Sequence, residues 1–359
     1  MWTMDNPPTE LLRQRHGFAP SRDWLDHLRL SSVRFMDGGS GSFASANGLV
    51  VTNHHVAAGQ LQKMSTAERN FMETGFYASE LADEIKCPDL EVNVLVSAKD
   101  VTGQIMGAVK KGMTPSAAVR ARDAKRASLA KACMDGEDIK CEVASLYQGG
   151  QYWLYRYRKY TDLRLVFAPE RQAAFFGGDW DNFTYPRYDL DVAFFRVYHQ
   201  DAPLSTEHFL RWDGQGVDKG DLVFITGHPG GTSRLYSMRE LEHARRVYYP
   251  VYLDYIARVL KGLEEYAKLG KEQRRRALIY QLGFANGQKA LSGMYRTLLD
   301  EKLMAEKQAS EDELRKKVGW EPETKLRYGD AWEQIQRVSD AHAQRRLHMA
   351  YRGMGRSRL

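Results

Sequence analysis

The stretch GSGSFASANGLVVTNHHVAAG, residues 39–59, decides the fold of the first half of this chain. Two runs of small and apolar residues flank Asn47-Gly48, and an Asn-Gly pair between such runs is typical of a β-hairpin turn. The second run leads into TNHHV, so we expect His54 and His55 at the end of a strand. A strand end holds the backbone rigid while the side chain can reach a cleft, as a general base requires.

Strand patterns extend from this hairpin to about residue 235. Short apolar runs broken by glycine and asparagine fill residues 30–100 and return later in the chain. The later strand patterns lie at residues 141–148, 152–160, 163–169, 190–198 and 221–230. Residues 101–134 are instead rich in Ala, Lys and Arg, a composition that predicts a helical insertion between strands.

The chain changes character at Met238, after which helical patterns dominate. Apolar residues recur at helical spacing over residues 251–270, and Ser310 with Glu313 matches a capping box that predicts another helix start. A length of 359 residues suits two domains. We therefore predict an α+β chain with a β domain over residues 1–235 and a helical domain over residues 236–359.

Composition excludes several classes of protein. With 43% hydrophobic and 27% charged residues, the chain is globular rather than disordered. No apolar run approaches the roughly 20 residues of a membrane span. The net charge is +6, but the basic residues alternate with Asp and Glu as on solvated helices, so we expect no nucleic-acid partner.

The two ends of the chain read as interior sequence. The start, MWTMDNPPTELL, lacks the basic and apolar regions of a signal peptide, and the end is the basic stretch HMAYRGMGRSRL. We expect both ends to be truncations or gene-model errors.

The cysteines do not predict a metal site, because Cys87, Cys133 and Cys141 show no ligand spacing with histidine. Cys133 and Cys141 either close a small disulfide loop, leaving Cys87 free, or remain thiols. We expect no metal and no cofactor.

The histidine segment resembles that of chymotrypsin-like proteases, in which a Gly-Ser-Gly strand, a hairpin and a Thr-Xaa-Xaa-His motif occur together. In this register Thr52 matches the threonine, His55 the catalytic histidine and Val56 the small apolar residue that follows. His54 is the alternative base and fits the register less well.

A candidate partner for this histidine lies in DVAFFRVY, residues 191–198. In the same proteases an aspartate precedes an apolar strand and accepts the imidazole N–H, and Asp191 fits that position. Asp189, on the same face of an extended segment, is the alternative. The order of histidine before aspartate is the chymotrypsin order, in which the serine comes last.

The nucleophile of such a triad is missing from this sequence. No glycine-flanked serine elbow follows Asp191, and Ser292 lies in a helical pattern. Ser40 lies in a Gly-Ser-Gly string but precedes the histidine. None of the cysteines has a nucleophile motif either.

Several longer motifs resemble the bacterial dipeptidyl-peptidase 7 and 11 family, and together they cover essentially the whole chain. They are MWTMDNPP (1–8), SSVRF (31–35), TNHHVAAGQLQ (52–62), GFYASEL (75–81), GGDWDNFTYPRYDLDVAFFRVY (177–198) and FITGHPGGTSRL (224–235).

The resemblance implies a chymotrypsin-like double β-barrel, of which this chain would hold the first part, and a helical cap domain. It implies a secreted or periplasmic serine peptidase that removes dipeptides from peptides with a free N-terminus, and we expect a homodimer. His55 and Asp191 would be the first two triad members, with the serine beyond the end of this chain. The isolated chain would therefore be inactive.

The resemblance also implies residues that bind the substrate ammonium group. Asn182 falls on the asparagine of the family's NWMWPR-like motif, with Phe183 where a tryptophan often stands. Asn286, in FANGQKALSG, falls on a second asparagine from the helical domain. Amide oxygens can accept hydrogen bonds from an ammonium group, which makes the assignment chemically reasonable.

Two alternatives to this function remain open at the level of sequence. A trypsin-like endopeptidase shares the Thr-Asn-Xaa-His-Val register but lacks the helical domain and the NFTYPR element. A non-catalytic peptide-binding relative would keep the fold without the serine.

Overall fold

The structure of the protein is a computed structural model that describes residues 2–36, 38–66, 68–231 and 233–354, with side chains to residue 345. Its contacts divide the chain into two compact units. The first is Met1–Phe176 with Tyr188–Gly231, and the second is Gly177–Arg187 with Thr232–Leu359. Strands lie in the first unit and long helices fill the second, so the predicted α+β class is confirmed. Residues 177–187 belong with the helical unit, although the predicted boundary lies at residue 235.

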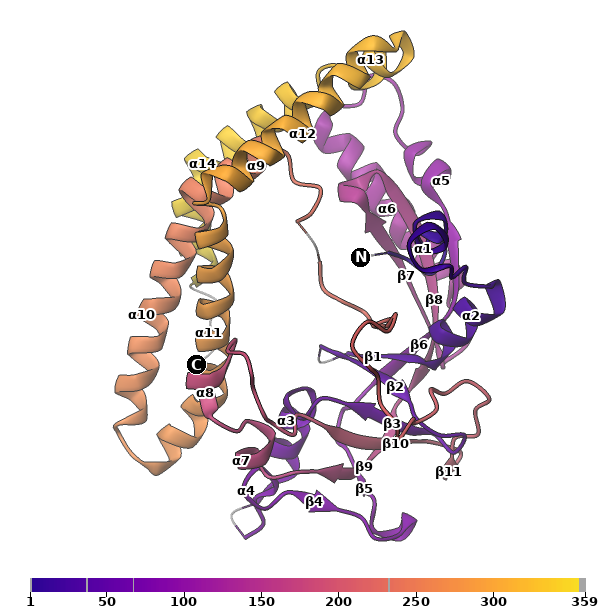
Figure 1. Ribbon diagram of the computed structural model, residues 1–359, viewed down its shortest axis with the longest axis vertical. Helices are drawn as coiled ribbons and strands as arrows, with labels where there is room; N and C mark the ends of the chain where they lie inside the picture. Colours follow the sequence, from indigo (N-terminus) through magenta and orange to yellow (C-terminus); the bar gives the residue numbers. More distant parts are fainter. Residues whose placement is uncertain (1, 37, 67, 232, 355–359) are drawn as a thin grey trace. The chain divides into compact units, whose positions relative to one another are not determined.

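All strand pairs described in the first unit are antiparallel (Figure 1). The strands are β1 (Ser32–Phe35), β2 (Ser40–Phe43), β3 (Leu49–Thr52), β4 (Phe76–Tyr77), β5 (Ile85–Lys86), β6 (Val92–Asp100), β7 (Ile139–Leu146), β8 (Gln151–Tyr160), β9 (Asp162–Ala168), β10 (Ala193–His199) and β11 (Ala202–Pro203).

Seven of these strands form a β-barrel, with β5 and β6 consecutive along the chain. The pairing runs from β1 to β2, β3, β10, β9 and β5. The chain continues from β5 into β6, which pairs back onto β1. Between β5 and β6 the Cys87 N–H donates to the Leu163 carbonyl at 2.8 Å, so this strand bridges both edges. These pairings agree with the antiparallel β-barrel of the predicted fold class.

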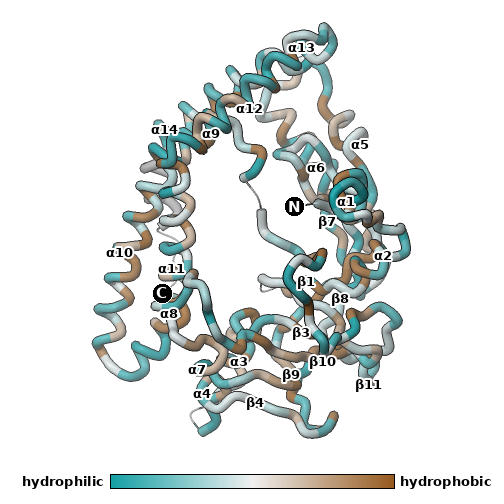
Figure 2. The backbone as a smooth tube through the Cα atoms, viewed as in Figure 1, coloured by the Kyte–Doolittle hydropathy of each residue, from teal (hydrophilic) through white to brown (hydrophobic). Residues whose placement is uncertain are grey.

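The barrel interior is filled by every second residue of its strands. Ala193, Phe195 and Val197 of β10 are fully buried, which is the period-two pattern of a strand with one buried face. They pack against Leu163 and Leu165 of β9 within one core cluster. Each fully buried large side chain contributes about 1.5–3 kcal/mol relative to exposure. Figure 2 shows the matching hydrophobic colouring along β9 and β10.

The Asn47-Gly48 turn predicted from the sequence joins β2 to β3. Gly48 has a φ of +74°, and a Cβ atom there would lie 2.8 Å from the Val197 carbonyl oxygen. Only glycine avoids both the left-handed strain and this collision. The hairpin that carries the histidines is thus packed directly against β10.

A three-stranded ribbon of β6, β8 and β7 extends from the barrel. It is covered by helices in the range for which composition predicts a helical insertion. A small second core joins Val101 and Ile105 to Val143 and Tyr152. Cys133 forms a disulfide with Cys141, which settles the alternative left open above, and Cys87 is free and buried.

The helices of the first unit are short apart from one. They are α1 (Thr9–His16), α2 (Arg22–Ser31), α3 (His54–Met64), α4 (Phe71–Thr74), η1 (Leu81–Asp83), α5 (Thr102–Met106), α6 (Pro115–Cys133), η2 (Tyr147–Gly149) and α7 (Arg171–Ala174).

The strand predicted at residues 221–230 is wrong, because this segment is irregular in the structure. Val223 and Ile225 are 59% and 98% exposed. A strand needs a hydrogen-bonded partner, and within the described residues none pairs with this segment. The apolar pattern alone therefore misled the prediction.

The second unit consists of helices, as its apolar periodicity predicts. They are α8 (Gly178–Asp181), α9 (Met238–His243), η3 (Ala244–Tyr248), α10 (Tyr249–Ala267), α11 (Lys271–Thr297), α12 (Glu301–Trp320), α13 (Pro322–Tyr328) and α14 (Ala331–Met354).

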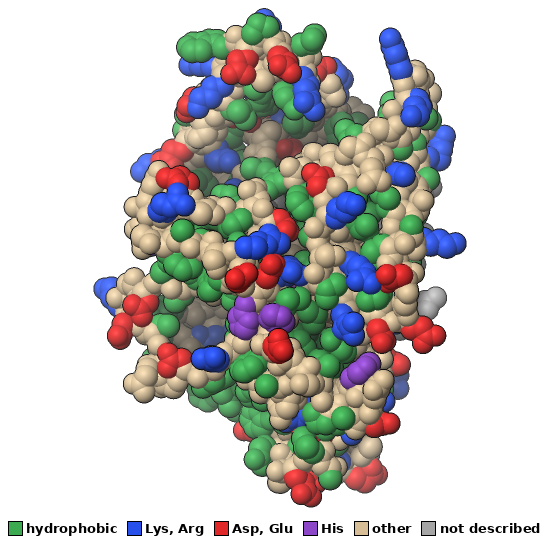
Figure 3. All heavy atoms as spheres, turned by 90° about the vertical axis from the view of Figure 1, so that its right-hand side faces the viewer, with side chains coloured by type: hydrophobic (Ala, Val, Ile, Leu, Met, Phe, Trp, Pro, Cys, Tyr) green, Lys and Arg blue, Asp and Glu red, His purple; other side chains and the backbone are tan. Residues whose placement is uncertain are grey.

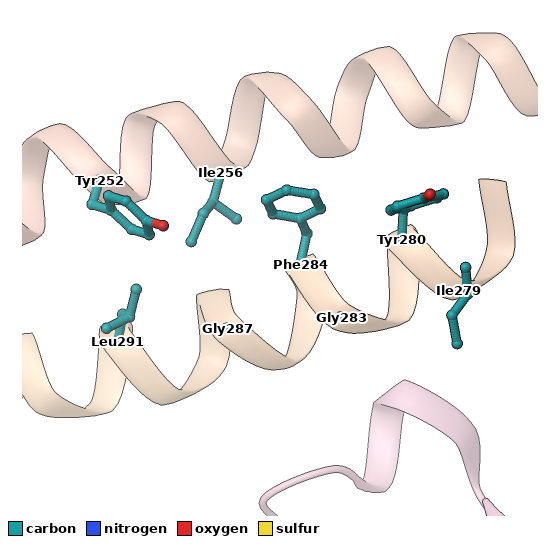
Figure 4. Close-up of a pocket in the computed structure, with 8 residues that line it drawn as sticks. All are labelled: Tyr252, Ile256, Ile279, Tyr280, Gly283, Phe284, Gly287 and Leu291. Atoms are coloured by element: carbon teal, nitrogen blue, oxygen red, sulfur yellow. The ribbon is translucent and has the colours of Figure 1, made fainter. Parts of the chain in front are cut away.

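Helices α10 and α11 line an open hollow of about 290 Å³. Tyr252 and Ile256 of α10 face Phe284 of α11 across it (Figure 4). Gly283 and Gly287 also line the hollow, since glycine leaves space where a side chain would otherwise fill the interface.

The predicted helix start at Ser310 is wrong. Helix α12 begins at Glu301, where the Asp300 carboxylate accepts the N–H groups of Lys302 and Leu303. Ser310 lies inside this helix and donates its hydroxyl to the Glu306 carbonyl one turn earlier. A serine with this back-bond resembles a cap in sequence without acting as one.

The surface agrees with the charge pattern of the sequence. On the face drawn in Figure 3, basic and acidic side chains are interspersed rather than gathered by sign. No helix in the described part of the chain is long and apolar enough to cross a membrane.

Candidate active site

His55 lies in the first turn of α3, directly after β3. The prediction that His54 and His55 lie at the end of a strand is therefore wrong by two to three residues, because the strand stops at Thr52 and the helix begins at His54. Thr52 pairs with Ala193 across β3 and β10. This register places the residues that follow β3 beside the residues that precede β10, where Asp191 lies.

The His55 imidazole meets the Asp191 carboxylate. His55 Nδ1 is 2.7 Å from Asp191 Oδ2. An ionised carboxylate only accepts hydrogen bonds, so Nδ1 carries the proton and Nε2 of the neutral ring is the basic nitrogen. The imidazole is 72% exposed and the carboxylate 26% exposed, so the ring is open to solvent while its partner is largely covered.

The carboxylate is held by two further donors. The backbone N–H of His55 donates to Asp191 Oδ1 at 3.0 Å. Asn53 Nδ2 donates to Asp191 Oδ2 and to the Asp191 carbonyl, both at 3.1 Å. Three donors to one carboxylate fix its orientation and favour its charged form.

These contacts shift the pKa values of both His55 and Asp191. The hydrogen bond to Asp191 raises the pKa of His55 above 6.5, against the opposing effect of burial. Burial alone would raise the pKa of Asp191, but the hydrogen bonds from His55 outweigh it and hold that pKa below 3.8. At neutral pH Asp191 is thus a fixed negative charge beside the ring.

The alternative residues are in different surroundings. His54 is 4% exposed, and burial lowers its pKa, so its ring is neutral and covered. Asp189 is exposed and acts on His55 through its charge, which raises the pKa of the ring. The structure brings His55 together with Asp191, the pair that the sequence register favours.

A buried ion pair supports the strand beyond Asp191. Arg196 of β10 donates to Glu84 Oε1 at 2.8 Å and to the Asn47 amide oxygen at 2.8 Å. Tyr198 donates its hydroxyl to Glu84 Oε2 at 2.8 Å. The strand after Asp191 is therefore tied to the Glu84 carboxylate, and Arg196 ties the same strand to the turn of the histidine hairpin.

The predicted ammonium ligands Asn182 and Asn286 contact each other in the helical unit. Asn182 Nδ2 donates to Asn286 Oδ1 at 3.1 Å. Asn182 ends α8 and Asn286 lies on α11, 104 residues further along the chain. Their direct contact is not evident from the sequence, in which they are far apart.

Arg187 fixes the orientation of both amides. Its Nη1 donates to Asn182 Oδ1 at 3.0 Å. A guanidinium only donates, so Asn182 must present its oxygen to Arg187 and its nitrogen to Asn286. Each amide oxygen then has a second lone pair with which it can accept a further donor.

The segment that carries these groups is pinned to α11. Lys289 forms an ion pair with Asp179 at 3.1 Å and also donates to the Asp179 carbonyl. Phe183, next to Asn182, has a φ of +64° and a side chain that is 64% exposed. A non-glycine residue in this conformation is uncommon and marks a tight turn or a strained position, which also occurs at functional sites.

Neither serine singled out in the sequence lies in a nucleophile motif. Ser40 accepts the backbone N–H of His228 at 2.7 Å and belongs to β2. Ser292 lies within α11. In the described part of the chain, no group of three or more His, Cys, Asp or Glu side chains could hold a metal ion.

Sequence reasoning missed Asn53 and Arg187. Each makes its contact through a side chain that no motif rule covers, and Asn53 reaches a residue 138 positions away. The signal that could have found Asn53 is its place between Thr52 and the paired histidines.

Comparisons with known proteins identify the family of this chain. A sequence profile of the family Peptidase S46 matches residues 1–358. A dipeptidyl-peptidase 7 of Capnocytophaga gingivalis is 27% identical over 84% of this chain and 44% of its own length. An Asp/Glu-specific dipeptidyl-peptidase of Shewanella putrefaciens is 31% identical over 76% of this chain and 38% of its own length.

Solved structures show the same fold. A crystal structure of Porphyromonas endodontalis DPP11 in complex with the dipeptide Arg-Asp matches with a TM-score of 0.81 and 23% identity. The match covers 90% of this chain and 49% of that chain. This chain therefore spans about half, or less, of the length of the proteins that it resembles.

Proposed function

Because this chain belongs to the peptidase S46 family, we propose that it supplies part of the active site of a serine-type dipeptidyl aminopeptidase. Relatives named as dipeptidyl-peptidases support the reaction class. The observation that carries the proposal is the 2.7 Å contact between His55 Nδ1 and the Asp191 carboxylate.

In the proposed reaction, His55 Nε2 takes the proton of a serine hydroxyl as its oxygen attacks the carbonyl carbon of the scissile bond. The imidazolium formed is stabilised by the Asp191 carboxylate. His55 then gives the proton to the departing amine, and the acyl-enzyme is hydrolysed by water with the same base. Asp191 keeps its charge throughout.

The amides of Asn182 and Asn286 are the proposed ligands of the substrate's terminal ammonium group. Their oxygens each have acceptor capacity left, and Arg187 sets their orientation. An extended dipeptide spans at most roughly 7 Å, so binding its ammonium group selects the second peptide bond for cleavage. The proposal requires the second unit to present these amides at that distance from the scissile bond.

The proposed compartment is the periplasm or the cell exterior. The Cys133–Cys141 disulfide supports it, since disulfides persist in oxidising compartments. Assembly as a homodimer stays a prediction from the family resemblance.

The test uses an active form of the enzyme that carries the nucleophile. We expect release of dipeptides from peptides with a free N-terminus and none from N-terminally acetylated peptides. His55→Ala should abolish turnover, and Asn182→Ala should raise KM, because it removes an ammonium ligand. Efficient cleavage of acetylated peptides would instead identify an endopeptidase, and peptide binding without turnover a non-catalytic relative.

A further inference from the structure

We propose that Asn53 is a positioning residue that holds the Asp191 carboxylate against the His55 imidazole. One amide nitrogen reaches two atoms of the same residue, the backbone carbonyl and carboxylate Oδ2, both at 3.1 Å. Asn53 therefore restrains both the main chain and the side chain of Asp191. This role rests on the proposed function only in treating the His55–Asp191 pair as catalytic.

The direction of the Asn53 amide follows from chemistry rather than from its placement. A carbonyl oxygen and an ionised carboxylate both accept hydrogen bonds, so only the NH2 group of Asn53 can face them. Its two hydrogens match the two acceptors. The amide is thus fully committed as a donor to Asp191.

Asn53 is also the residue before the first turn of α3, and it does not act as a cap. An asparagine at this position normally accepts an N–H of the first helical turn. Here its side chain forms no such bond, and the His55 N–H is accepted by Asp191 Oδ1 instead. Asp191 thus caps α3, and Asn53, released from that role, holds Asp191.

The pairing of two barrel strands brings Asn53 and Asp191 close enough for these contacts. Thr52 pairs with Ala193, so residue 53, directly after β3, and residues 192 and 191, directly before β10, are neighbours. The donor and the carboxylate leave adjacent strands of one rigid sheet. Positioning from such elements is more exact than positioning from a loop.

The imidazole itself reports this role. We would label histidine with ¹⁵N and assign the His55 signal, one of ten, by its loss in His55→Gln. Above the pKa of His55, the Nδ1 and Nε2 shifts give the ratio of the two neutral tautomers. The wild-type ring should carry its proton on Nδ1, because Asp191 accepts it there.

Two substitutions separate positioning from helix capping. Asn53→Ala removes the donor, and Asn53→Gly removes it while leaving a residue that is well tolerated before a helix. We expect both to lower the ratio of Nδ1–H to Nε2–H tautomer on the order of tenfold, the factor for a hydrogen bond to a charged acceptor. In an active form of the enzyme, kcat should fall by a similar factor with KM unchanged.

The matched control is Asn70→Ala. Asn70 precedes α4 and accepts the Met72 N–H at 3.2 Å, so it is a true cap in the same unit. This variant should leave the His55 tautomer ratio at the wild-type value. Thermal unfolding of all three variants confirms that each is folded when its spectrum is recorded.

The outcomes distinguish this inference from the proposed function. A wild-type tautomer ratio in folded Asn53→Ala and Asn53→Gly would overturn the role of Asn53 and leave the peptidase proposal standing. A lowered ratio in both, in an enzyme that releases no dipeptide, would support the role of Asn53 and sink the peptidase proposal.

Discussion

At the scale of single residues, the hydrogen bond between His55 and Asp191 contributes to the stability of the fold by an amount that depends on pH. The pKa of His55 is raised in the folded protein. Its contribution to the free energy of unfolding is therefore fully present below about pH 6.5 and is lost as the pH rises through the folded-state pKa. The pKa of Asp191 is lowered in the folded protein. Its contribution to the free energy of unfolding is therefore present above about pH 3.8 and is lost as the pH falls through the folded-state pKa. Because the imidazole is 72% exposed, solvent screens this contribution and keeps it small.

Asp191→Asn should lower the pKa of His55, since it removes the charge that stabilises the imidazolium. An NMR titration of the ring checks this in the chain as it stands. In an active form, the same change should cost on the order of 10⁴ in kcat, as in trypsin-like enzymes. Asp189→Asn is the control, because Asp189 acts on the ring through its charge without a hydrogen bond to it. An equal pKa decrease in both variants would contradict the assignment of Asp191.

The two members of the pair were predictable because each lies in a short motif with a fixed register to a strand. The donors around them were not. Asn53 and Arg187 act through side-chain hydrogen bonds that depend on which strands and helices become neighbours. That adjacency is set by the folded sheet and helices rather than by local spacing.

At the scale of elements, the buried Glu84 binds Arg196, which ties the strand that follows Asp191 to the turn of the histidine hairpin. Its side chain is 2% exposed and that of Arg196 is 11% exposed. Glu84→Ala leaves a buried guanidinium without its carboxylate, so we expect a loss of about 3–5 kcal/mol in the free energy of unfolding. Chemical denaturation measures this loss.

A surface pair provides the comparison for this variant. Lys86 and Asp162 are 3.0 Å apart, with Lys86 64% exposed. Lys86→Ala should cost less than about 1 kcal/mol. Similar losses in both variants would show that the Glu84 network is not a buried structural link.

The disulfide between Cys133 and Cys141 fastens the end of α6 to β7. Closing this short loop restricts the unfolded chain by about 2–3 kcal/mol in the chain-entropy account. Cys133→Ser should lower the free energy of unfolding by that amount, as measured by chemical denaturation. Dithiothreitol should have no further effect on the variant. Cys87→Ser, at the free and buried cysteine, should keep the response to dithiothreitol.

Strands and helices were largely predictable because alternation and helical periodicity are local. The errors at residues 221–230 and at Ser310 share one cause. In both cases the local pattern does not determine which group the segment bonds. Residues 221–230 have no paired strand among the described residues, and the Ser310 hydroxyl donates to a carbonyl within a helix that has already begun. The hairpin succeeded because both strands and the turn lie in one short stretch.

At the scale of the whole molecule, the chain holds a barrel with a base and its carboxylate, and a helical unit with an amide cluster. We predict that the 359-residue chain alone releases no dipeptide from chromogenic substrates, since no serine elbow follows Asp191 in its sequence. Loss of the nucleophile costs on the order of 10⁶ in turnover in serine proteases. Turnover by the purified chain that His55→Ala abolishes would refute the prediction.

The aspartate that caps α3 links chemistry to folding at a single position. A gene copy released from selection for peptide hydrolysis would still need an acceptor there, because the helix would otherwise begin with an unsatisfied amide. Retention of aspartate at this place in a relative is therefore poor evidence that the relative is an active enzyme, whereas the histidine, which no helix end requires, is the more telling marker.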